Sequence, residues 1–343
     1  MKIEMLQNAP IMFRVGALAL GWLALISALH VAVNGEKPPA RRILMGYMPV
    51  VTNLAAPLLD AASKDAPLRF EAVKFASFAE MGEAFKSGHI DAAFIIAPLT
   101  IAMHRQGIPL KVVYVGNRHE STMIVRNDMK ADSMLDLIGA TVAVPMRFSG
   151  HLLAIRRFLR THGLPQDAIR TVEIPPPDMA AALSTGGVDG YFVGEPFACK
   201  SVLSGTGKKL LYVEELWPKF ICNCVVVSDE LIRSHPDRVQ ALVSGAARSG
   251  LWAQTHPEEA VDVASRYWGQ SPDIVRCGLT NPPGRVRFDL YTPVEKEFEE
   301  LASEMEQSGL LEGPVDVLGL VEDRFAKAVA EEPAHSLKEI LER

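Results

Sequence analysis

The sequence lacks any long run of basic residues. Its 343 residues include 35 Lys and Arg against 41 Asp and Glu, which gives a formal net charge of −6. Non-specific nucleic-acid binding depends on a clustered positive surface, so no nucleic-acid partner is expected. Aromatic residues are only 7% of the chain, which argues against a surface that stacks sugars or bases. Four cysteines in so long a chain are also too few for a disulfide framework.

What the sequence does have is an ordinary globular composition. Hydrophobic residues are 48% and charged residues 22% of the chain, with 25 Gly and 23 Pro, which excludes intrinsic disorder. The chain is longer than one hydrophobic core supports. We therefore expect two lobes of about one to two hundred residues each.

The N-terminal part is dominated by a nearly continuous apolar run at 15–33, preceded by Lys2 and Arg14. A polar, Pro-containing joint at 35–39 follows it. This layout is typical of an export signal, so we expect residues 1–40 to direct the chain to the periplasm or another extracytoplasmic place. The run is also long enough to stay in the inner membrane as an anchor, and the sequence leaves cleavage open.

Two later segments match each other without a gap. Residues 88–98 and 186–196 both follow the pattern Gly-x-(Ile/Val)-Asp-small-x-Phe-(Ile/Val)-x-x-Pro. Each follows a short predicted helix, which begins at Ser77 in the first half and at Asp178 in the second. The repeat predicts two lobes with a shared structural plan.

The elements before these helices correspond as well. Strands are predicted at 42–47 and 141–144, followed by helices from about Thr52 and from Ser149. Each half is thus strand–helix–strand–helix, which predicts a parallel sheet with crossover helices.

The chain after about residue 225 is predicted to be mainly helical. An all-helical tail of this length is expected to pack onto the first lobe. The predicted helices are 229–234, 236–254, 257–268, 293–308 and 315–330.

Ligands of such sheets bind at the carboxyl ends of strands, next to helix N-termini. Four segments from the two halves meet this description: 48–53, 97–100, 149–151 and 194–196. If the lobes face each other, these loops converge on one cleft. Free backbone N–H groups there would suit an anionic or strongly polar ligand.

Residues 175–179 (PPPDM) and 188–196 (VDGYFVGEP) resemble the nitrate- and bicarbonate-binding proteins of bacterial ABC importers. The wider family includes the aliphatic-sulfonate, taurine and thiamine-pyrimidine binding proteins. Residues 136–139, and 235–236 at a helix start, agree with this resemblance, which covers roughly 42–330.

The resemblance implies an α/β, two-lobed periplasmic-binding-protein fold of the second type, with a cleft between the lobes and the helical C-terminal part packed on lobe one. Lobe one would be 42–124 plus 226–343, and lobe two 125–225. Family members capture a small solute by closing the lobes and deliver it to a membrane permease with its ATPase. We expect a monomer that binds its solute without catalysis and needs no cofactor, and we predict no metal site.

Individual site residues stay open between a ligand contact and an ordinary structural role. In the nitrate-binding relatives a His at the place of His151 contacts the anion, but a capping Ser149 beside a surface His is the alternative. For the other candidate residues, the alternatives are helix capping, strand packing or hydrogen bonds within the protein. The residues we expect to contact the solute are Thr52, Asn53, Pro98, Thr122, Ser149, Gly150, His151, Glu195 and Asn223.

The sequence departs from the resemblance at 220–224. Nitrate- and bicarbonate-binding relatives carry a Lys there, in a His-Pro-Glu-Lys stretch, whereas this chain has Phe-Ile-Cys-Asn-Cys. The missing Lys removes a charge partner for nitrate, and the missing carboxylate removes an acid that could help hold calcium beside bicarbonate. We therefore expect a larger organic solute, such as a sulfonate, a carboxylate or a heterocycle, with Asn223 as a neutral hydrogen-bonding partner.

The pair Cys222 and Cys224 invites a metal interpretation. Zinc would need two further ligands, and no suitable Cys or His pattern accompanies the pair. We therefore expect both to be buried free cysteines.

An enzyme on the same fold is the alternative function, similar to a thiamine-pyrimidine synthase or to menaquinone-pathway enzymes. Residues 222–224 faintly resemble the Cys-rich loop of such a synthase. Those enzymes are cytosolic, whereas the apolar run at 15–33 indicates export, which favours the importer component. The anchored sensor of a signalling system is a weaker third hypothesis, because no signalling segment follows.

Overall fold

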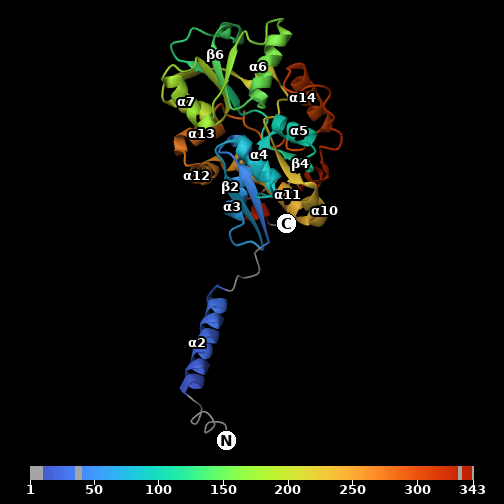
Figure 1. Ribbon diagram of the computed structural model, residues 1–343. Coiled ribbons are helices and arrows are strands. Elements are labelled where there is room, and N and C mark those ends of the chain that lie inside the picture. Colours follow the sequence, from blue (N-terminus) through green and yellow to red (C-terminus); the bar gives the residue numbers. More distant parts are fainter. Residues whose placement is uncertain (1–10, 35–40, 331–333, 342–343) are drawn as a thin grey trace. The chain divides into compact units, whose positions relative to one another are not determined.

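The computed structural model describes residues 11–34, 41–330 and 334–341, in two units that divide at Arg41 (Figure 1). In the N-terminal unit, α2 (Ile11–Asn34) is one helix of 24 residues. The joint predicted at 35–39 lies outside the described residues. Among the residues with a described placement, no helix is both long enough and apolar enough to span a membrane.

The second unit is built on two five-stranded sheets. Sheet A has the order β2-β1-β3-β10-β4, with β1 (Arg41–Tyr47), β2 (Leu68–Lys74), β3 (Ala92–Ile96), β4 (Leu110–Val115) and β10 (Asn223–Ser228). Sheet B has the order β7-β6-β8-β5-β9, with β5 (Ser121–Arg126), β6 (Thr141–Val144), β7 (Arg170–Glu173), β8 (Gly190–Gly194) and β9 (Gly207–Tyr212). We call sheet A with its helices lobe one, and sheet B with its helices lobe two. Helices α6 and α7 lie with β6 in the upper lobe of Figure 1.

Both sheets are mixed, which corrects the prediction of purely parallel sheets. Strand β1 runs parallel to β3 and β6 runs parallel to β8, but β10 and β5 are antiparallel to their neighbours. Strands β5 and β10 are those that the chain enters directly after crossing from the other lobe, at 116–120 and 217–222. The boundaries expected from the sequence, 124/125 and 225/226, fall inside these two strands.

The repeated aspartate has the same role in both lobes. A carboxylate oxygen of Asp91 accepts the N–H of Leu44 at 2.8 Å, and its own N–H donates to the Leu44 carbonyl. Asp189 makes the same pair of bonds with Thr141, at 2.9 Å for the carboxylate. Each aspartate therefore ties the start of its strand to the parallel neighbour, which explains why the residue recurs.

The predicted helix starts are largely confirmed. Ser77 caps α4 (Phe78–Lys86) and Ser149 caps α6 (Gly150–Thr161), each through its hydroxyl. The helix predicted from Thr52 begins as a 3₁₀ turn, η1 (Val51–Asn53), and continues as α3 (Ala55–Ala62). Helix α7 (Pro176–Ser184) begins two residues before the predicted Asp178, because prolines are well accommodated in a first helical turn.

The C-terminal helices pack mainly on lobe one, as predicted. The confirmed helices are α10 (Asp229–Ser234), α11 (Pro236–Thr255), α12 (Pro257–Trp268) and α14 (Glu295–Gln307). Helices α11 and α12 pack on α3, and α14 packs on α5 (Ala97–Arg105). Their core with sheet A includes Trp252 and Phe94.

Two parts of this region differ from the prediction. Helix α13 (Pro272–Thr280) was not predicted. The helix predicted at 315–330 is reduced to α15 (Arg324–Lys327), because residues around Val321 pair with the edge of β4 and Gly319 has a φ of +71°.

Candidate functional site

The residues predicted to contact a solute are all buried, and they lie where the two lobes meet. Lobe one supplies Thr52, Asn53, Pro98 and Asn223, and lobe two supplies Thr122, Ser149, Gly150, His151 and Glu195. Two pairs of them are bonded directly, Asn53 with Asn223 and Thr122 with Glu195. Their role toward a ligand stays a prediction.

Asn53 and Asn223 form the lobe-one side of the interface. Asn223 Nδ2 donates to Asn53 Oδ1 at 2.7 Å, and Asn53 Nδ2 donates to the carbonyls of Met48 and Phe94. The Asn53 amide thus holds its own loop in place. Asn223 Oδ1 and Thr52 Oγ1 are buried and have no hydrogen-bond partner in the described part of the chain.

His151 stands on the lobe-two side. Its Nε2 lies 2.9 Å from Ser121 Oγ, and its ring packs against Phe192 and Phe220 at centroid distances of 5.2 and 5.9 Å. Burial lowers the pKa of His151 to about 3, so the imidazole is neutral near pH 7. Its Nδ1 is buried without a partner among the described residues. His151 is therefore not the surface residue that the sequence left as an alternative.

Three of the predicted contacts shape the backbone of the interface. Ser149 Oγ accepts the N–H of Leu152 at 3.2 Å, which is the capping role left open above. A Cβ on Gly150 would lie 2.7 Å from the Phe220 ring, so this position requires glycine or a shift of the ring. Pro98 lies in the first turn of α5 and is buried.

The Glu195 side chain forms hydrogen bonds within lobe two, and its backbone carbonyl accepts a hydrogen bond from lobe one. Its Oε1 accepts from Thr122 Oγ1 at 2.8 Å and its Oε2 from the Cys199 N–H at 3.0 Å. Burial raises the pKa of this carboxyl group. The Glu195 carbonyl accepts the N–H of Val51, at 2.8 Å, from lobe one. Glu195 thus fixes the start of α8 (Phe197–Leu203) against the loop that follows β1.

Glu120, in the first crossing segment, is an interface residue that the sequence analysis missed. Its side chain is 1% exposed, with Oε1 bonded to Ser121 Oγ and Oε2 without a partner in the described part. Burial, opposed mainly by the Ser121 hydrogen bond, raises the pKa of Glu120 to about 7. A Cβ on Gly194 would lie 2.5 Å from Oε2. The sequence signal was this glycine, which stands where the first copy of the repeat has Ile96.

These contacts connect the two lobes through one set of polar groups. Asn53 forms a hydrogen bond with Asn223. The residue before Asn223 is Cys222, which lies against the Glu120 carboxyl group. Ser121 forms hydrogen bonds with both Glu120 and His151. We call this set the inner polar cluster: Thr52, Asn53, Glu120, Ser121, His151, Cys222 and Asn223.

Four side-chain atoms of the inner polar cluster are buried without a partner in the described part of the chain. They are Thr52 Oγ1, Glu120 Oε2, His151 Nδ1 and Asn223 Oδ1. Each such atom costs about 1–3 kcal/mol, so native proteins contain few of them. Unpartnered polar atoms that come from both lobes are expected at a site where a ligand or water supplies the missing hydrogen bonds.

Cys222 and Cys224 are both free and buried, as predicted. Within the described residues, no group of three or more His, Cys, Asp or Glu side chains is arranged to hold a metal ion.

The remaining two cysteines form a disulfide that the sequence analysis did not predict. Cys199 in α8 and Cys277 in α13 are bridged, with their Cα atoms 6.1 Å apart. Helix α8 packs on sheet B and α13 packs on α12, so the bridge joins lobe two to the helices of lobe one. Beside it, Gly278 lies so close to Pro196 that an added Cβ would be 2.8 Å from the proline Cβ.

Arg285 makes a second connection between the lobes. It comes from the segment after α13 and lies over the Tyr212 ring at 3.9 Å. Its guanidinium donates to the Ser121 carbonyl at 2.8 Å and to Glu214, in α9 (Val213–Leu216), also at 2.8 Å. The Arg285 side chain is 4% exposed and that of Glu214 is 23% exposed, so the guanidinium end of this ion pair is shielded from water.

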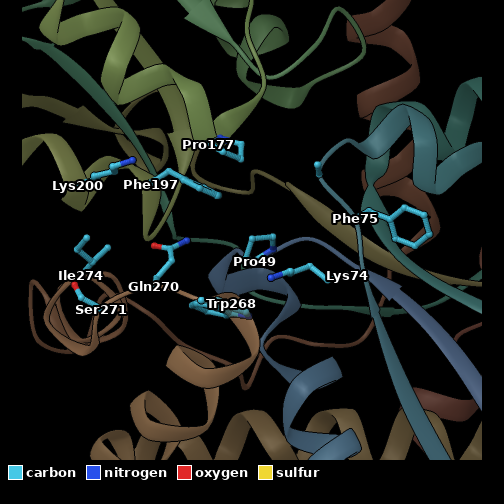
Figure 2. Close-up of a pocket in the computed structure, with 12 residues that line it drawn as sticks. Pro49, Lys74, Phe75, Pro177, Phe197, Lys200, Trp268, Gln270, Ser271 and Ile274 are labelled. Carbon is cyan, nitrogen blue, oxygen red and sulfur yellow. The ribbon is translucent and has the colours of Figure 1, made fainter.

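An open pocket of about 490 Å³ is lined by residues of both lobes (Figure 2). It is formed by loops of lobe one after β1 and β2, by the starts of α7 and α8 in lobe two, and by the turn between α12 and α13. No sequence motif predicts this pocket. Its lining residues are Pro49, Lys74, Phe75, Ala76, Pro177, Phe197, Lys200, Trp268, Gly269, Gln270, Ser271 and Ile274.

Two α/β lobes joined by two chain crossings over a buried polar interface form the fold of a two-lobed periplasmic binding protein. Residues 36–267 match the NMT1-like family, and the chain belongs to this family.

Relatives of known function support this class. The chain is 25% identical over 252 residues to the taurine-binding periplasmic protein of Escherichia coli, which covers 69% of this chain and 77% of that protein. It is 24% identical over 255 residues to a nitrate/nitrite binding protein of Synechococcus elongatus, covering 64% of this chain and 57% of that protein.

Solved structures share the fold. The ligand-binding component of an ABC-type import system from Staphylococcus aureus has a TM-score of 0.74 at 22% identity, covering 85% of this chain and 100% of that one. The desulfurization enzyme DszB is less similar, with a TM-score of 0.57 at 17% identity, covering 83% of this chain and 97% of that one.

Proposed function

We propose that the protein is the extracytoplasmic substrate-binding component of an ABC importer and that it captures a small anionic or polar organic solute between its lobes. The inner polar cluster carries this proposal, because four buried, unpartnered polar atoms from both lobes meet there. Taurine- and nitrate-binding relatives supply the class of ligand. The solute would pass to a membrane permease driven by its ATPase.

An enzyme on this fold is the second candidate, and the likeness to DszB favours it. The chemistry of the inner polar cluster argues against it. Burial raises the pKa of the Cys222 thiol, which disfavours the thiolate that a nucleophilic mechanism needs. His151 pairs with Ser121 rather than with Cys222, so the imidazole is not placed to activate the thiol. Binding without catalysis is the better account of these groups.

We expect residues 1–40 to carry the chain across the cytoplasmic membrane. The apolar run at 15–33 motivates this expectation, and the Cys199–Cys277 disulfide supports it because disulfides persist in oxidising compartments. A reporter enzyme that is active only outside the cytoplasm, fused after Ala40, should be active. The matched fusion without residues 1–40 should be inactive, and the reverse result would contradict export.

A thermal-shift screen of sulfonates, carboxylates, heterocycles and inorganic anions, followed by calorimetry, tests the function directly. We expect an organic solute to bind more tightly than nitrate or bicarbonate. His151→Ala should weaken the solute that the screen identifies by at least a few-fold, because the inner polar cluster would lose one of its free side-chain atoms. Stabilisation by none of these solutes would count against the proposed function.

Asn223→Lys should improve the binding of nitrate by roughly one to two decades, since charge-assisted hydrogen bonds contribute about 1.5–3 kcal/mol. Asn223 is 1% exposed and bonded to Asn53, so an ammonium there would join the unpartnered atoms of the inner polar cluster. Asn223→Met is the control, because methionine is similar in size to lysine but uncharged. It should not improve the binding of nitrate. Submicromolar nitrate binding by the unaltered protein, measured by calorimetry, would overturn this account of selectivity.

A further inference from the structure

The charged residues that line the open pocket are both lysines, one from each lobe. Lys74 ends β2 in lobe one, and Lys200 lies on α8 in lobe two. In Figure 2 their ammonium ends point toward the middle of the pocket from opposite sides. Neither lysine forms an ion pair within the described part of the chain. Two opposed cations without a lining carboxylate attract an anion.

The pocket is too large for an inorganic anion alone. One water molecule occupies about 30 Å³ of the liquid, so an ion the size of a few waters would leave most of the 490 Å³ empty. Phe197 and Trp268 contribute aromatic walls, and Pro49 and Ile274 contribute aliphatic ones. A ligand that fills this space therefore needs a sizeable apolar body as well as an anionic group.

Two walls of the pocket are joined covalently. Lys200 directly follows Cys199 in α8, and Ile274 shares α13 with Cys277. The Cys199–Cys277 disulfide therefore joins the lobe-two wall to the α13 wall. A pocket whose walls are already in place binds without the entropic cost of ordering them.

The pocket lies next to a backbone contact between the lobes. Pro49 and Phe197, which line the pocket, lie two residues from Val51 and Glu195, and the Val51 N–H donates to the Glu195 carbonyl between the lobes. We call this pocket the outer pocket, because Lys74 and Lys200 in its lining are exposed, whereas the residues of the inner polar cluster are buried.

We propose that the outer pocket binds an organic anion with a bulky apolar body, and that Lys74 and Lys200 bind its sulfonate or carboxylate group. The proposal rests on the proposed function and narrows its solute class. It also assigns the two lysines and the α12–α13 turn to solute recognition.

Naphthalene-2-sulfonate is a suitable probe, because it carries one anionic group and a rigid aromatic body. Calorimetry with the full chain should show binding of one molecule per chain. Lys74→Gln and Lys200→Gln should each weaken binding about tenfold, the loss expected for one charge-assisted hydrogen bond. Lys64→Gln is the matched control, since Lys64 is exposed, belongs to lobe one and does not line the pocket. It should bind the probe as the unaltered protein does.

Two further measurements sharpen the test. Gln270→Glu places a carboxylate in the lining at a half-buried position, so it should weaken the probe by at least tenfold while the protein stays folded. The neutral naphthalene-2-sulfonamide should bind about tenfold more weakly than the sulfonate, and 2-naphthoate should bind within a few-fold of it.

The inference would be overturned if naphthalene-2-sulfonate did not bind at about 1 mM, or if both lysine variants bound it as tightly as the unaltered protein. In either case the capture of another solute in the screen above would leave the proposed function standing. A failure of the outer pocket is thus distinguished from a failure of the function.

Discussion

Replacement of Cys199 and Cys277 by serine is expected to lower the thermal midpoint of unfolding by roughly 6 °C. The disulfide closes a loop with a sequence separation of 78 residues, and such a constraint stabilises by roughly 4 kcal/mol. Unfolding a body of about 300 residues has an entropy of roughly 0.6 kcal/mol per degree, which gives the expected shift.

The same change is expected to let the lobes separate. The sequence alone predicts a ligand-free open state that closes on the solute, but the disulfide ties α8 of lobe two to α13 beside lobe one. The oxidised protein should therefore change little in radius of gyration when a solute binds. The double serine variant should have a larger radius without solute and should contract when solute is added.

Small-angle scattering and a thermal melt, each with and without reductant, test both expectations. The internal control is the double serine variant, in which a reductant should change neither quantity, because Cys222 and Cys224 are already free. An oxidised and a reduced protein with the same midpoint and the same scattering profile would show that the bridge does not restrain the lobes.

Features that depend on local patterns could be predicted from the sequence. The repeat located Asp91 and Asp189 because each ties its strand to a parallel neighbour through the same two bonds. Helix starts at Ser77 and Ser149 were found because a hydroxyl cap is a local signal. The antiparallel direction of β5 and β10 was not predicted, because it depends on where the chain crosses between the lobes.

The parts of the site that were missed depend on contacts between distant residues. Cys199 and Cys277 share no spacing pattern, and Arg285 reaches Glu214 from a different lobe. Lys74 and Lys200 belong to no motif, and only the assembled cleft places them across one pocket. The predicted contacts came from helix starts instead, which is why Ser149 was included although its hydroxyl is occupied by the cap.

The two buried titratable groups of the inner polar cluster are expected to give opposite pH dependences of stability. Burial raises the pKa of Glu120 from 4.5 to about 7, so the folded state keeps a proton that the unfolded chain has lost. Its contribution is fully present below pH 4.5 and is lost as the pH rises to about 7. Burial lowers the pKa of His151 from 6.5 to about 3, so its contribution is present above pH 6.5 and is lost as the pH falls to about 3.

Between about pH 4.5 and 6.5 the two groups change the free energy of unfolding in opposite directions, so their effects nearly cancel in the unaltered protein. A variant that lacks one of the two groups should therefore show the pH dependence that the other group causes. In Glu120→Gln only the His151 slope remains, and the free energy of unfolding should gain about 2 kcal/mol more than the unaltered protein does between pH 4.5 and 6.5. In His151→Gln it should lose a similar amount over the same interval.

Denaturant titrations at pH 4.5, 5.5 and 6.5, values chosen to lie at about the limits and middle of this window, measure these differences. Glu299→Gln is the matched control, because Glu299 is exposed on α14 and lies outside the inner polar cluster, so its curve should follow that of the unaltered protein. Parallel curves for Glu120→Gln and the unaltered protein would mean that Glu120 is ionised in the folded state at all three pH values. The carboxylate would then be a fixed negative charge beside Cys222 and Ser121, and the inner polar cluster would repel the anions that the outer lysines attract.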